Sequence, residues 1–318
     1  MKKTVLAIGI FDGVHAGHRR IISAAIREAK KKRRESVVVT FDPHPLKVLK
    51  PHISVPSIMS ASHRLKLICA LGAGKCCVLK FDKKFSKMTP RDFAGKVIAG
   101  KFNASKVFIG RNFVFGKGNS GNASSLKKLG LEYGFGVEVV PMVKAKGEIV
   151  SSTAIRRYIM NGKLSEAARM LGRPVSVYGT VVSGKKRGRL LGYPTANIDP
   201  HHEAIPPAGV YAVWVKRGKR RYGGALFIGK PSTFGETETV VEVHIFDFHE
   251  FIYHEDIEVE FVRRLRGVRK FADHTKLIAQ IKRDDTNARK ILKFHNGGKT
   301  PLHLWSIMLL CRHIGGTC

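Results

Sequence analysis

Two histidines stand three residues apart in a glycine-rich stretch near the start of the chain, residues 9–18, which read G-I-F-D-G-V-H-A-G-H. The stretch follows an apolar run and opens a helical pattern, so we expect a turn between a strand and a helix. A helix N-terminus presents backbone N–H groups and a positive dipole end, which attract phosphate. His15 and His18 are therefore candidates for stabilising charge that develops on a nucleotide phosphate. Glycine allows close backbone approach, and the candidate phosphate-binding residues of the turn are Gly9, Phe11, Gly13 and Gly17.

This histidine pattern has two other interpretations. The pair could cap the helix without touching a ligand, or it could form part of a metal site. A metal site is disfavoured because no third ligand follows at helical spacing. The strand–turn–helix context favours phosphate binding.

A hydroxyl-rich stretch stands at residues 151–156, which read S-S-T-A-I-R. Small hydroxyls cap the start of a helix, and an arginine one turn later can bind phosphate through two N–H groups. The candidates here are Ser152, Thr153 and Arg156. Taken alone, the pattern is typical of an ordinary helix cap.

The second half of the chain contains another glycine-rich stretch, which includes G-R-L-L-G-Y-P-T-A-N at residues 188–197. Its glycines can bring backbone donors around phosphates, and Thr195 with Asn197 offers the hard oxygen ligands that Mg²⁺ prefers. A basic, glycine-rich hairpin turn is the alternative. The candidate nucleotide-binding residues are Gly184, Gly188, Arg189, Gly192, Thr195 and Asn197.

Polar and apolar side chains alternate from residue 241 onward, which is typical of a strand. Glu242 and His244 must therefore share one face of that strand. A carboxylate can accept the proton of a substrate hydroxyl during phosphoryl transfer, so Glu242 is a candidate base. An exposed edge strand is the alternative, and we interpret His244 as structural.

Short apolar runs alternate with helical patterns in the first half of the chain. This alternation predicts βα units and an α/β fold with a doubly wound parallel sheet. A Thr89-Pro90 pair is a typical helix start. The expected strands are residues 4–10, 36–41, 76–81, 106–109 and 137–140, and the expected helical stretches are residues 18–33, 62–71, 90–98, 124–133 and 152–171.

The pattern changes after a Gly-Arg-Pro break at residues 172–174. Strand patterns then follow at close spacing, which predicts an antiparallel barrel or sandwich followed by one helix at residues 273–293. The expected strands are residues 175–182, 210–216, 225–228, 240–248 and 257–262. We therefore expect domains at 1–160 and 173–293, and a poorly ordered tail of unknown role at 294–318.

Composition narrows the class of protein. A chain of 318 residues with 43% hydrophobic and 25% charged residues is expected to fold, most simply as two domains. Five cysteines without a C-x-x-C pair suit a reducing compartment, and no apolar run is long enough for a membrane span, so we expect a cytoplasmic protein. The net charge of +33, from 57 basic and 24 acidic residues, suits polyphosphate ligands or nucleic acid. Charge spread over solvated faces is the plainer explanation.

In their order along the chain, these motifs resemble the bifunctional riboflavin kinase/FAD synthetase family of bacteria. The histidine stretch resembles its nucleotidyltransferase signature, H-x-G-H, and residues 40–45, T-F-D-P-H-P, resemble its second-strand motif. Residues 110–118 resemble its flavin- and nucleotide-contacting loop, and residues 151–156 its S-S-T-x-x-R signature. Residues 188–197 resemble the kinase signature, and residues 241–248 the strand with the kinase's catalytic glutamate. The resemblance covers residues 4–293.

This resemblance implies an FMN adenylyltransferase (FAD synthetase) domain at 1–160 and a riboflavin kinase barrel with a C-terminal helix at 173–293. One ATP would phosphorylate riboflavin to FMN, and a second would adenylylate FMN to FAD with release of pyrophosphate, with Mg²⁺ on the phosphates. Thr195 and Asn197 would help to hold that Mg²⁺. The implied catalytic residues are His15, His18, Arg156 and Glu242, and the implied flavin-binding residues are Asn112 and Phe113.

The chain departs from the family pattern at two places. At residues 228–234 a proline and its neighbour are exchanged, and Arg111 stands where the family is often acidic or variable. Two alternatives stay open: a nucleotidyltransferase for another phosphate-bearing acceptor with a degenerate barrel, and a basic nucleic-acid-binding protein. The intact motifs around Asn197 and Glu242 argue against the first. The second is motivated by the charge and by the basic run at 30–34, but no nucleic-acid-binding module is recognisable. The sequence predicts no oligomeric state.

Overall fold

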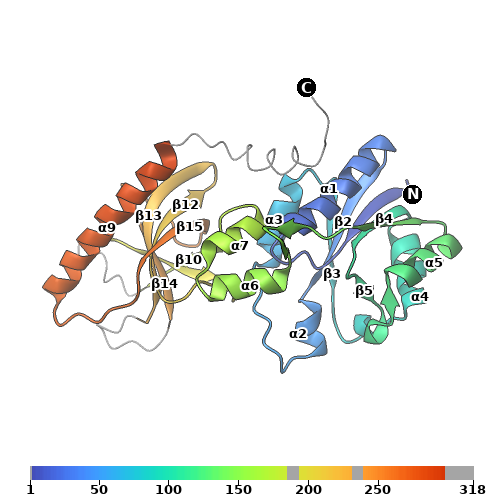
Figure 1. Ribbon diagram of the computed structural model, residues 1–318, viewed down its shortest axis with the longest axis horizontal. Helices are drawn as coiled ribbons and strands as arrows, with labels where there is room; N and C mark the ends of the chain where they lie inside the picture. Colours follow the sequence, from blue (N-terminus) through green and yellow to red (C-terminus); the bar gives the residue numbers. More distant parts are fainter. Residues whose placement is uncertain (1, 185–192, 231–238, 298–318) are drawn as a thin grey trace. The chain divides into compact units, whose positions relative to one another are not determined.

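The computed structural model describes residues 2–184, 193–230 and 239–297, with side chains described up to residue 293 (Figure 1). The chain divides into two compact units, Met1–Ile155 and Arg156–Cys318. Each unit has its own sheet and its own hydrophobic core.

A five-stranded parallel sheet forms the centre of the first unit, in the order β3-β2-β1-β4-β7 (Figure 1). The strands are β1 Thr4–Ile8, β2 Glu35–Asp42, β3 Lys75–Lys80, β4 Ala104–Gly110 and β7 Gly136–Val140. The strand order reverses at β1, whose neighbours are β2 and β4. Ligands of open α/β sheets bind at the carboxyl ends of the strands beside such a reversal. The predicted doubly wound sheet is therefore confirmed, and its reversal lies where the histidine stretch leaves β1.

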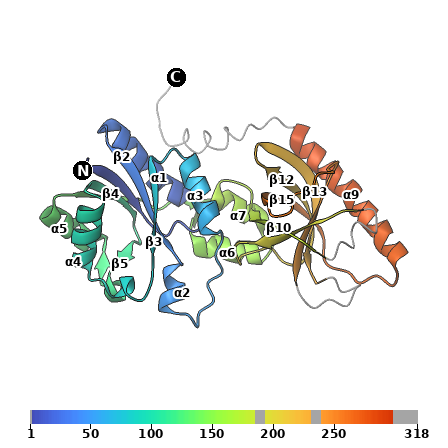
Figure 2. The ribbon, with the colours of Figure 1, turned by 180° about the vertical axis from the view of Figure 1, so that it is seen from behind.

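Helices cover both faces of this sheet. On one face, α1 Ala16–Lys31 and α3 Ala61–Ala70 pack against alternate residues of β1, including Val5 and Ala7 (Figure 2). On the other face, α5 Ala123–Tyr133 and the π-helix Phe93–Lys101 pack against Leu6 and Ile8. The shorter elements are α2 Pro45–Leu49, α4 Pro90–Asp92, two 3-10 turns at Phe85–Lys87 and Lys117–Asn119, and the small ladders of β5 Val114–Phe115 with β6 Gly121–Asn122 and of β8 Lys144–Ala145 with β9 Glu148–Ile149.

Several boundaries expected between residues 4 and 171 shift. The first strand ends at Ile8, and α1 begins two residues before His18, because His15 is its N-cap. Thr89 caps α4 as expected, but the helix continues as a π-helix after Asp92. The single helical stretch expected at 152–171 is wrong: α6 Ser152–Met160 and α7 Leu164–Leu171 are separated by a turn in which Gly162 has φ of 73°.

The second unit is a closed antiparallel barrel of six strands, in the order β10-β11-β14-β13-β12-β15 (Figure 1). Its strands are β10 Ser176–Val182, β11 Ala196–Pro200, β12 Gly209–Arg217, β13 Arg220–Gly229, β14 Val240–Ile245 and β15 Asp256–Arg266. The first strand pairs with the last, so the sheet closes on itself. The barrel prediction is confirmed, although β11 was not expected as a strand.

One long helix, α9 His274–Gly297, packs on the outside of the barrel (Figure 2). Its Ala288 and Leu292 are buried with Trp214 and Phe246 of the barrel. The half-buried Arg266 of β15 and the buried Asp284 of the helix form an ion pair at 2.7 Å. The helix extends four residues past the expected end at 293, and the rest of the predicted tail, residues 298–318, lies outside the described residues.

Candidate functional site

The turn after β1 has an unusual backbone that buried side chains hold in place. Phe11 and Val14 have φ of 52° and 37°, and both side chains are buried. Such left-handed conformations cost about 1–3 kcal/mol each and persist only where the surroundings fix them. Gly13, with φ of 89°, suits its position, and a Cβ on Gly9 would lie 2.7 Å from the Phe11 ring. The predicted glycines of this turn are therefore required by its shape.

His15 and His18 stack on each other at the start of α1, with ring centroids 3.5 Å apart. His15 is only 6% exposed, and its Nδ1 accepts the backbone N–H of His18 at 3.3 Å. A Cβ on Gly17 would lie 3.1 Å from the His15 ring, so this glycine makes room for the stack. His15 therefore caps α1. Because Nδ1 acts as an acceptor, a neutral His15 carries its proton on Nε2, which makes that atom a donor.

Asp12 connects this turn with two distant segments. Its carboxylate, 2% exposed, accepts the backbone N–H groups of Ile58 at 3.1 Å and of Met59 at 3.3 Å. Its backbone carbonyl accepts the hydroxyl of Ser152 at 2.8 Å, across 140 residues of sequence. The structure therefore brings the first residue of α6 to the histidine turn.

The hydroxyls at the start of α6 have different roles. Ser151 caps the helix, because its Oγ accepts the backbone N–H of Ala154 at 3.2 Å. Ser152, one of the predicted phosphate-binding candidates, donates its hydroxyl to the Asp12 carbonyl. Arg156 lies one turn further along the same helix, as the first residue of the second unit.

Arg64 was missed by the sequence analysis, although it lies at the carboxyl edge of the sheet. This residue of α3 is 3% exposed, and its guanidinium donates to the carbonyls of Ile10 and Phe41, both at 3.0 Å. Its Nη2 also lies 3.6 Å from a carboxylate oxygen of Asp42. Burial lowers the pKa of Arg64, and the charges of Asp12 and Asp42 oppose that shift. Arg64 therefore joins the ends of β1 and β2, just where the histidine stretch and the T-F-D-P-H-P stretch begin.

Replacing Arg64 with methionine is expected to destabilise the first unit by about 1–3 kcal/mol, the usual cost of a buried polar group left without its partner. The Phe41 carbonyl loses the donor that Arg64 supplies, whereas the Ile10 carbonyl keeps the Thr40 hydroxyl at 2.8 Å. Thermal unfolding of the full chain measures the change. The control is Lys66→Met, on the exposed part of the same helix; equal unfolding temperatures for the two variants would contradict the prediction.

The loop after β4 carries the predicted flavin-binding residues. Asn112 is exposed, and its Nδ2 lies 3.9 Å from the sulfur of Met142. Phe113 is half-buried and stacks on Phe115 with ring centroids 5.6 Å apart. Both residues follow the strand next to β1, at the carboxyl edge of the sheet.

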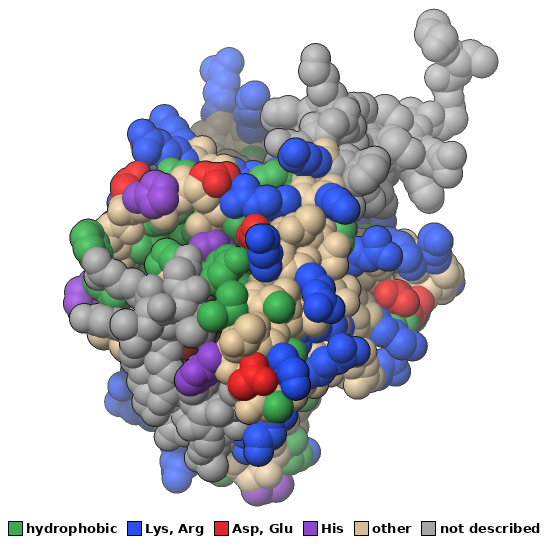
Figure 3. Space-filling view, turned by 90° about the vertical axis from the view of Figure 1, so that its left-hand side faces the viewer, with side chains coloured by type: hydrophobic (Ala, Val, Ile, Leu, Met, Phe, Trp, Pro, Cys, Tyr) green, Lys and Arg blue, Asp and Glu red, His purple; other side chains and the backbone are tan. Residues whose placement is uncertain are grey.

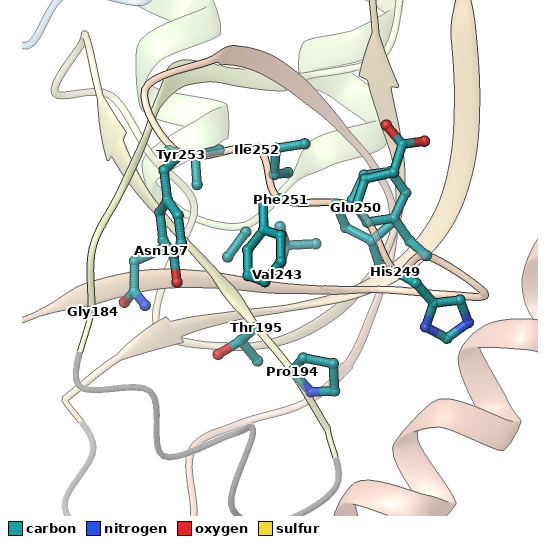
Figure 4. Close-up of a pocket in the computed structure, with 14 residues that line it drawn as sticks. Gly184, Pro194, Thr195, Asn197, Val243, His249, Glu250, Phe251, Ile252 and Tyr253 are labelled. Atoms are coloured by element: carbon teal, nitrogen blue, oxygen red, sulfur yellow. The ribbon is translucent and has the colours of Figure 1, made fainter.

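A cavity of about 280 Å³ lies at the barrel, and three of the predicted kinase residues line it: Gly184, Thr195 and Asn197 (Figure 4). The loop between β14 and β15 forms the opposite wall, with Phe248, His249, Glu250, Phe251 and Tyr253. Phe251 is 75% exposed although it lines the cavity. This aromatic loop was missed by the sequence analysis, which extended the strand to 248; Asp247 has φ of 55°, and the strand ends at Ile245. The other predicted kinase residues, Gly188, Arg189 and Gly192, lie outside the described residues.

Glu242 lies on β14 directly opposite Asn197 of β11. Directly opposite residues of antiparallel strands share a face, with Cβ atoms about 4.5–5.5 Å apart. Glu242 is half-buried and is not among the residues that line the cavity. His244, two residues along, bonds through Nδ1 to the carbonyl of Pro194 at 2.8 Å. This bond holds the segment that carries Thr195, which agrees with a structural role for His244.

Gly184→Ala is expected to lower the rate of any phosphoryl transfer at the cavity by about 10²-fold. A reacting group displaced by about 1 Å typically costs that much. An added Cβ there would overlap the side-chain amide of Asn197, which must then move. Gly184→Ala can be compared with Gly267→Ala, where the nearest atom lies 3.8 Å from the added Cβ. Equal phosphorylation rates for the two variants would contradict the expected role of this close approach.

Two protein-family models match this chain, one in each half of the sequence. The FAD synthetase family model matches residues 1–154, and the riboflavin kinase family model matches residues 171–292. A bifunctional riboflavin kinase/FMN adenylyltransferase of Buchnera aphidicola is 35% identical over 285 residues, which are 88% of this chain and 91% of the relative. The chain belongs to the bifunctional riboflavin kinase/FMN adenylyltransferase family.

Two further known proteins are similar to this chain along most of its length. The Listeria monocytogenes protein of the same description is 35% identical and covers 90% of this chain and 91% of its own length. A solved structure from Streptococcus pneumoniae, described as a macrolide-efflux protein, is 32% identical with a TM-score of 0.78. It covers 91% of this chain and 95% of its own. Within the described residues of the present chain, no helix is both long and apolar enough to cross a bilayer.

Proposed function

We propose that the chain makes FAD from riboflavin in two ATP-dependent steps, one in each unit. The proposal rests mainly on one observation, that the chain matches its family across both units. The second unit phosphorylates riboflavin to FMN. The first unit transfers AMP from ATP to FMN and releases pyrophosphate. We expect the chain to act in the cytoplasm, because its five cysteines include no C-x-x-C pair and suit a reducing compartment.

In the adenylyl transfer, a phosphate oxygen of FMN attacks the α-phosphorus of ATP, and the bond to pyrophosphate breaks. This nucleophile is already charged near neutral pH, so the protein mainly aligns the reactants and stabilises developing charge. His15 and His18 donate to the phosphates from the N-terminus of α1, where the helix dipole also favours negative charge. The geometry that supports this role is their stack at the helix start, with His15 held as the cap.

The remaining candidates of the first unit position the two substrates. Gly9, Gly13 and Gly17 let the backbone approach the nucleotide phosphates, and Phe11 shapes the turn. Ser152 fixes the turn through the Asp12 carbonyl, while Thr153 and Arg156 bind phosphate from α6. We assign Asn112 and Phe113, in the loop after β4, to the flavin.

In the kinase step, Glu242 accepts the proton of the riboflavin 5′-hydroxyl while the γ-phosphoryl group of ATP is transferred to that oxygen. The in-register pairing of Glu242 with Asn197 supports this role, because it puts a carboxylate beside a predicted nucleotide ligand. Gly184, with Gly188, Arg189 and Gly192 beyond the described residues, contributes to phosphate binding.

The residues at the cavity fit a magnesium ion carried by ATP. Thr195 and Asn197 supply two side-chain oxygens to one cavity, and Mg²⁺ commonly takes one or two protein ligands with the remainder from phosphates and water. When bound, the ion neutralises charge on the phosphates during transfer. In the described part of the chain no cluster of three or more His, Cys, Asp or Glu side chains forms a separate metal site.

The exposed aromatic residues of the cavity bind a planar ring of the substrate. Phe251 and Tyr253 point into the same space as Thr195 and Asn197 (Figure 4). A cavity that combines phosphate-binding groups with aromatic surface suits a nucleotide, so we assign these two rings to the adenine of ATP. Burial of an aromatic face is the main favourable contribution to such contacts.

The alternative of a nucleic-acid-binding protein has less support. Lysine and arginine side chains are distributed over the face shown in Figure 3, and acidic side chains lie among them. Several described arginines are paired, as in the contacts of Arg217 with Glu255 and of Arg289 with Asp247. The alternative of a different phosphate-bearing acceptor also has less support, because three of the predicted kinase residues, Gly184, Thr195 and Asn197, line one cavity at the barrel.

One experiment tests the proposal directly. The purified protein is incubated with riboflavin, ATP and Mg²⁺, and the flavins are separated by chromatography. The expected result is early FMN followed by FAD. If FMN but not FAD forms, the assignment of the first unit fails. If FAD forms only from added FMN, the assignment of the second unit fails. If neither flavin is turned over, both assignments are rejected.

A fragment of residues 152–297 is expected to phosphorylate riboflavin without making FAD, because it contains the barrel and α9. The fragment should include α6 and α7, since the turn between them contacts the barrel: a Cβ on Gly162 would lie 3.5 Å from Pro207. A shorter fragment, 171–297, loses that contact and should unfold at a lower temperature. Circular dichroism and the chromatographic assay measure both properties, and FAD formation by either fragment would contradict the assignment of units.

A further inference from the structure

Two cysteines of the first unit face each other across the loop that connects α3 to β3. Cys69 lies near the end of α3 and Cys76 near the start of β3, and their sulfur atoms are 3.5 Å apart. Neither residue belongs to the sites described above. A disulfide has a sulfur–sulfur length of about 2.05 Å, so bond formation requires the two sulfur atoms to approach by about 1.5 Å.

The environments of the two thiols differ. Cys69 is exposed and Cys76 is half-buried. Burial, together with the hydrogen bond to Cys69, raises the pKa of Cys76 to about 12. Cys76 therefore keeps its proton near neutral pH, and Cys69 is the sulfur that an oxidant in solution reaches first.

The neighbouring residue, Cys77, provides a natural comparison. Successive residues of a strand point to opposite faces, and here Cys76 packs with the core under α1 and α3, whereas Cys77 packs with the core on the other face. Cys77 is only one residue further from Cys69 in sequence than Cys76 is. It lies on the opposite face of the sheet, however, so its sulfur cannot meet that of Cys69.

We propose that Cys69 and Cys76 form a reversible oxidation site that reacts with hydrogen peroxide. Peroxide oxidises the Cys69 thiol to a sulfenic acid and is reduced to water. The sulfur of Cys76 then attacks the sulfenic sulfur, the sulfur–sulfur bond forms, and the hydroxyl leaves as a second water with the Cys76 proton. In total two thiols lose two electrons and two protons, and one peroxide becomes two waters. A small thiol reduces the bond again by thiol–disulfide exchange.

The bond would join two elements that support the adenylyl-transfer site. Helix α3 carries Arg64, which holds the ends of β1 and β2, and β3 pairs with β2 along its length. The cross-link closes a loop of only eight residues, which restricts the unfolded chain. Oxidation is therefore expected to raise the unfolding temperature of the first unit by a few degrees.

Peptide mapping tests this inference in the full chain. In every protein, Cys311 and Cys318, which lie outside the described residues, are replaced by serine. The native protein is treated with a few equivalents of peroxide, its free thiols are blocked, and it is digested with trypsin. Cleavage after Lys66, Lys75 and Lys80 puts Cys69 in one peptide and Cys76 with Cys77 in the next. The expected product is these two peptides linked, with two hydrogens lost, and it separates when a small thiol is added.

Single variants identify the sulfur atoms involved. The linked product should persist in Cys77→Ser and disappear in Cys69→Ser and in Cys76→Ser, while all three variants remain folded by circular dichroism. A link that survives in Cys76→Ser but disappears in Cys77→Ser would overturn the inference. So would stable sulfinic acid on Cys69 without a link, or a link found only between two chains on a non-reducing gel. The test is independent of flavin turnover, so its failure leaves the proposed function untouched.

Discussion

A His18→Ala variant is expected to accumulate FMN from riboflavin while FAD formation falls by ~10²–10³, the usual effect of losing one preorganised donor to a transition-state charge. The imidazole of His18 stacks on His15, but the cap of α1 depends on the backbone N–H of residue 18, which alanine retains. The helix start therefore keeps its main hydrogen bond, and the change removes mainly the donor. Chromatography of the flavins formed from riboflavin and from added FMN measures both steps.

The second unit supplies the internal control for this variant. Riboflavin phosphorylation should continue at the parent rate, because its site lies in the barrel. His52→Ala, at an exposed position of the first unit, should leave both steps unchanged. His15→Ala should differ from both, since it also removes the cap and about 0.5–2 kcal/mol of stability. FAD formation by a folded His18→Ala protein within a few-fold of the parent rate would refute the role of His18.

Glu242→Gln is expected to have the opposite pattern, with riboflavin phosphorylation reduced by the ~10²–10⁴ typical of a lost general base. Glutamine keeps the size of the side chain and its ability to form hydrogen bonds, but it cannot accept the proton of the 5′-hydroxyl. Adenylylation of added FMN should persist, because FMN needs no deprotonation near neutral pH. The two rates are measured separately, with riboflavin and with FMN as the flavin substrate.

Thermal unfolding distinguishes catalysis from structure for this residue. Glu242 is half-buried opposite Asn197. A purely structural role therefore predicts a lower unfolding temperature for Glu242→Gln, together with loss of any activity that requires the folded barrel. A catalytic role predicts an unchanged unfolding temperature with the kinase step lost alone. Glu203→Gln, at an exposed position of the same unit, is the matched control. Normal phosphorylation in a stable Glu242→Gln protein would rule out the base.

The fold could be predicted well where side-chain pattern and secondary structure agree. The apolar run of β1 is buried along its whole length, and Glu242 and His244 share the less buried face of β14. Prediction was wrong where a local signal was absent or pointed elsewhere. The strand β11 begins at the end of the stretch at residues 188–197, whose glycines and proline indicate a turn. Only its pairing with β10 and β14 makes it a strand. Gly162 was too weak a signal to predict the break between α6 and α7.

In the candidate sites, too, the sequence could identify residues of one local element but not residues whose role depends on tertiary contacts. Spacing could identify the histidine stretch, because both histidines belong to one turn of one helix. No local pattern distinguishes Arg64 from an ordinary solvated arginine of an amphipathic helix, since its burial depends on the ends of two strands distant in sequence. No sequence pattern marks Phe251 either, and it becomes part of a cavity wall only because the barrel closes.

The hydrogen bond between the Ser152 hydroxyl and the Asp12 carbonyl has a consequence for biosynthesis. A ribosome produces the histidine turn before its partner, which is synthesised 140 residues later. Contacts of such separation form late in folding, because the loop they close must first be ordered. A nascent chain that has not yet produced α6 therefore exposes an incomplete turn. The ability to bind nucleotide in the first unit should arise only after nearly all of that unit has left the ribosome.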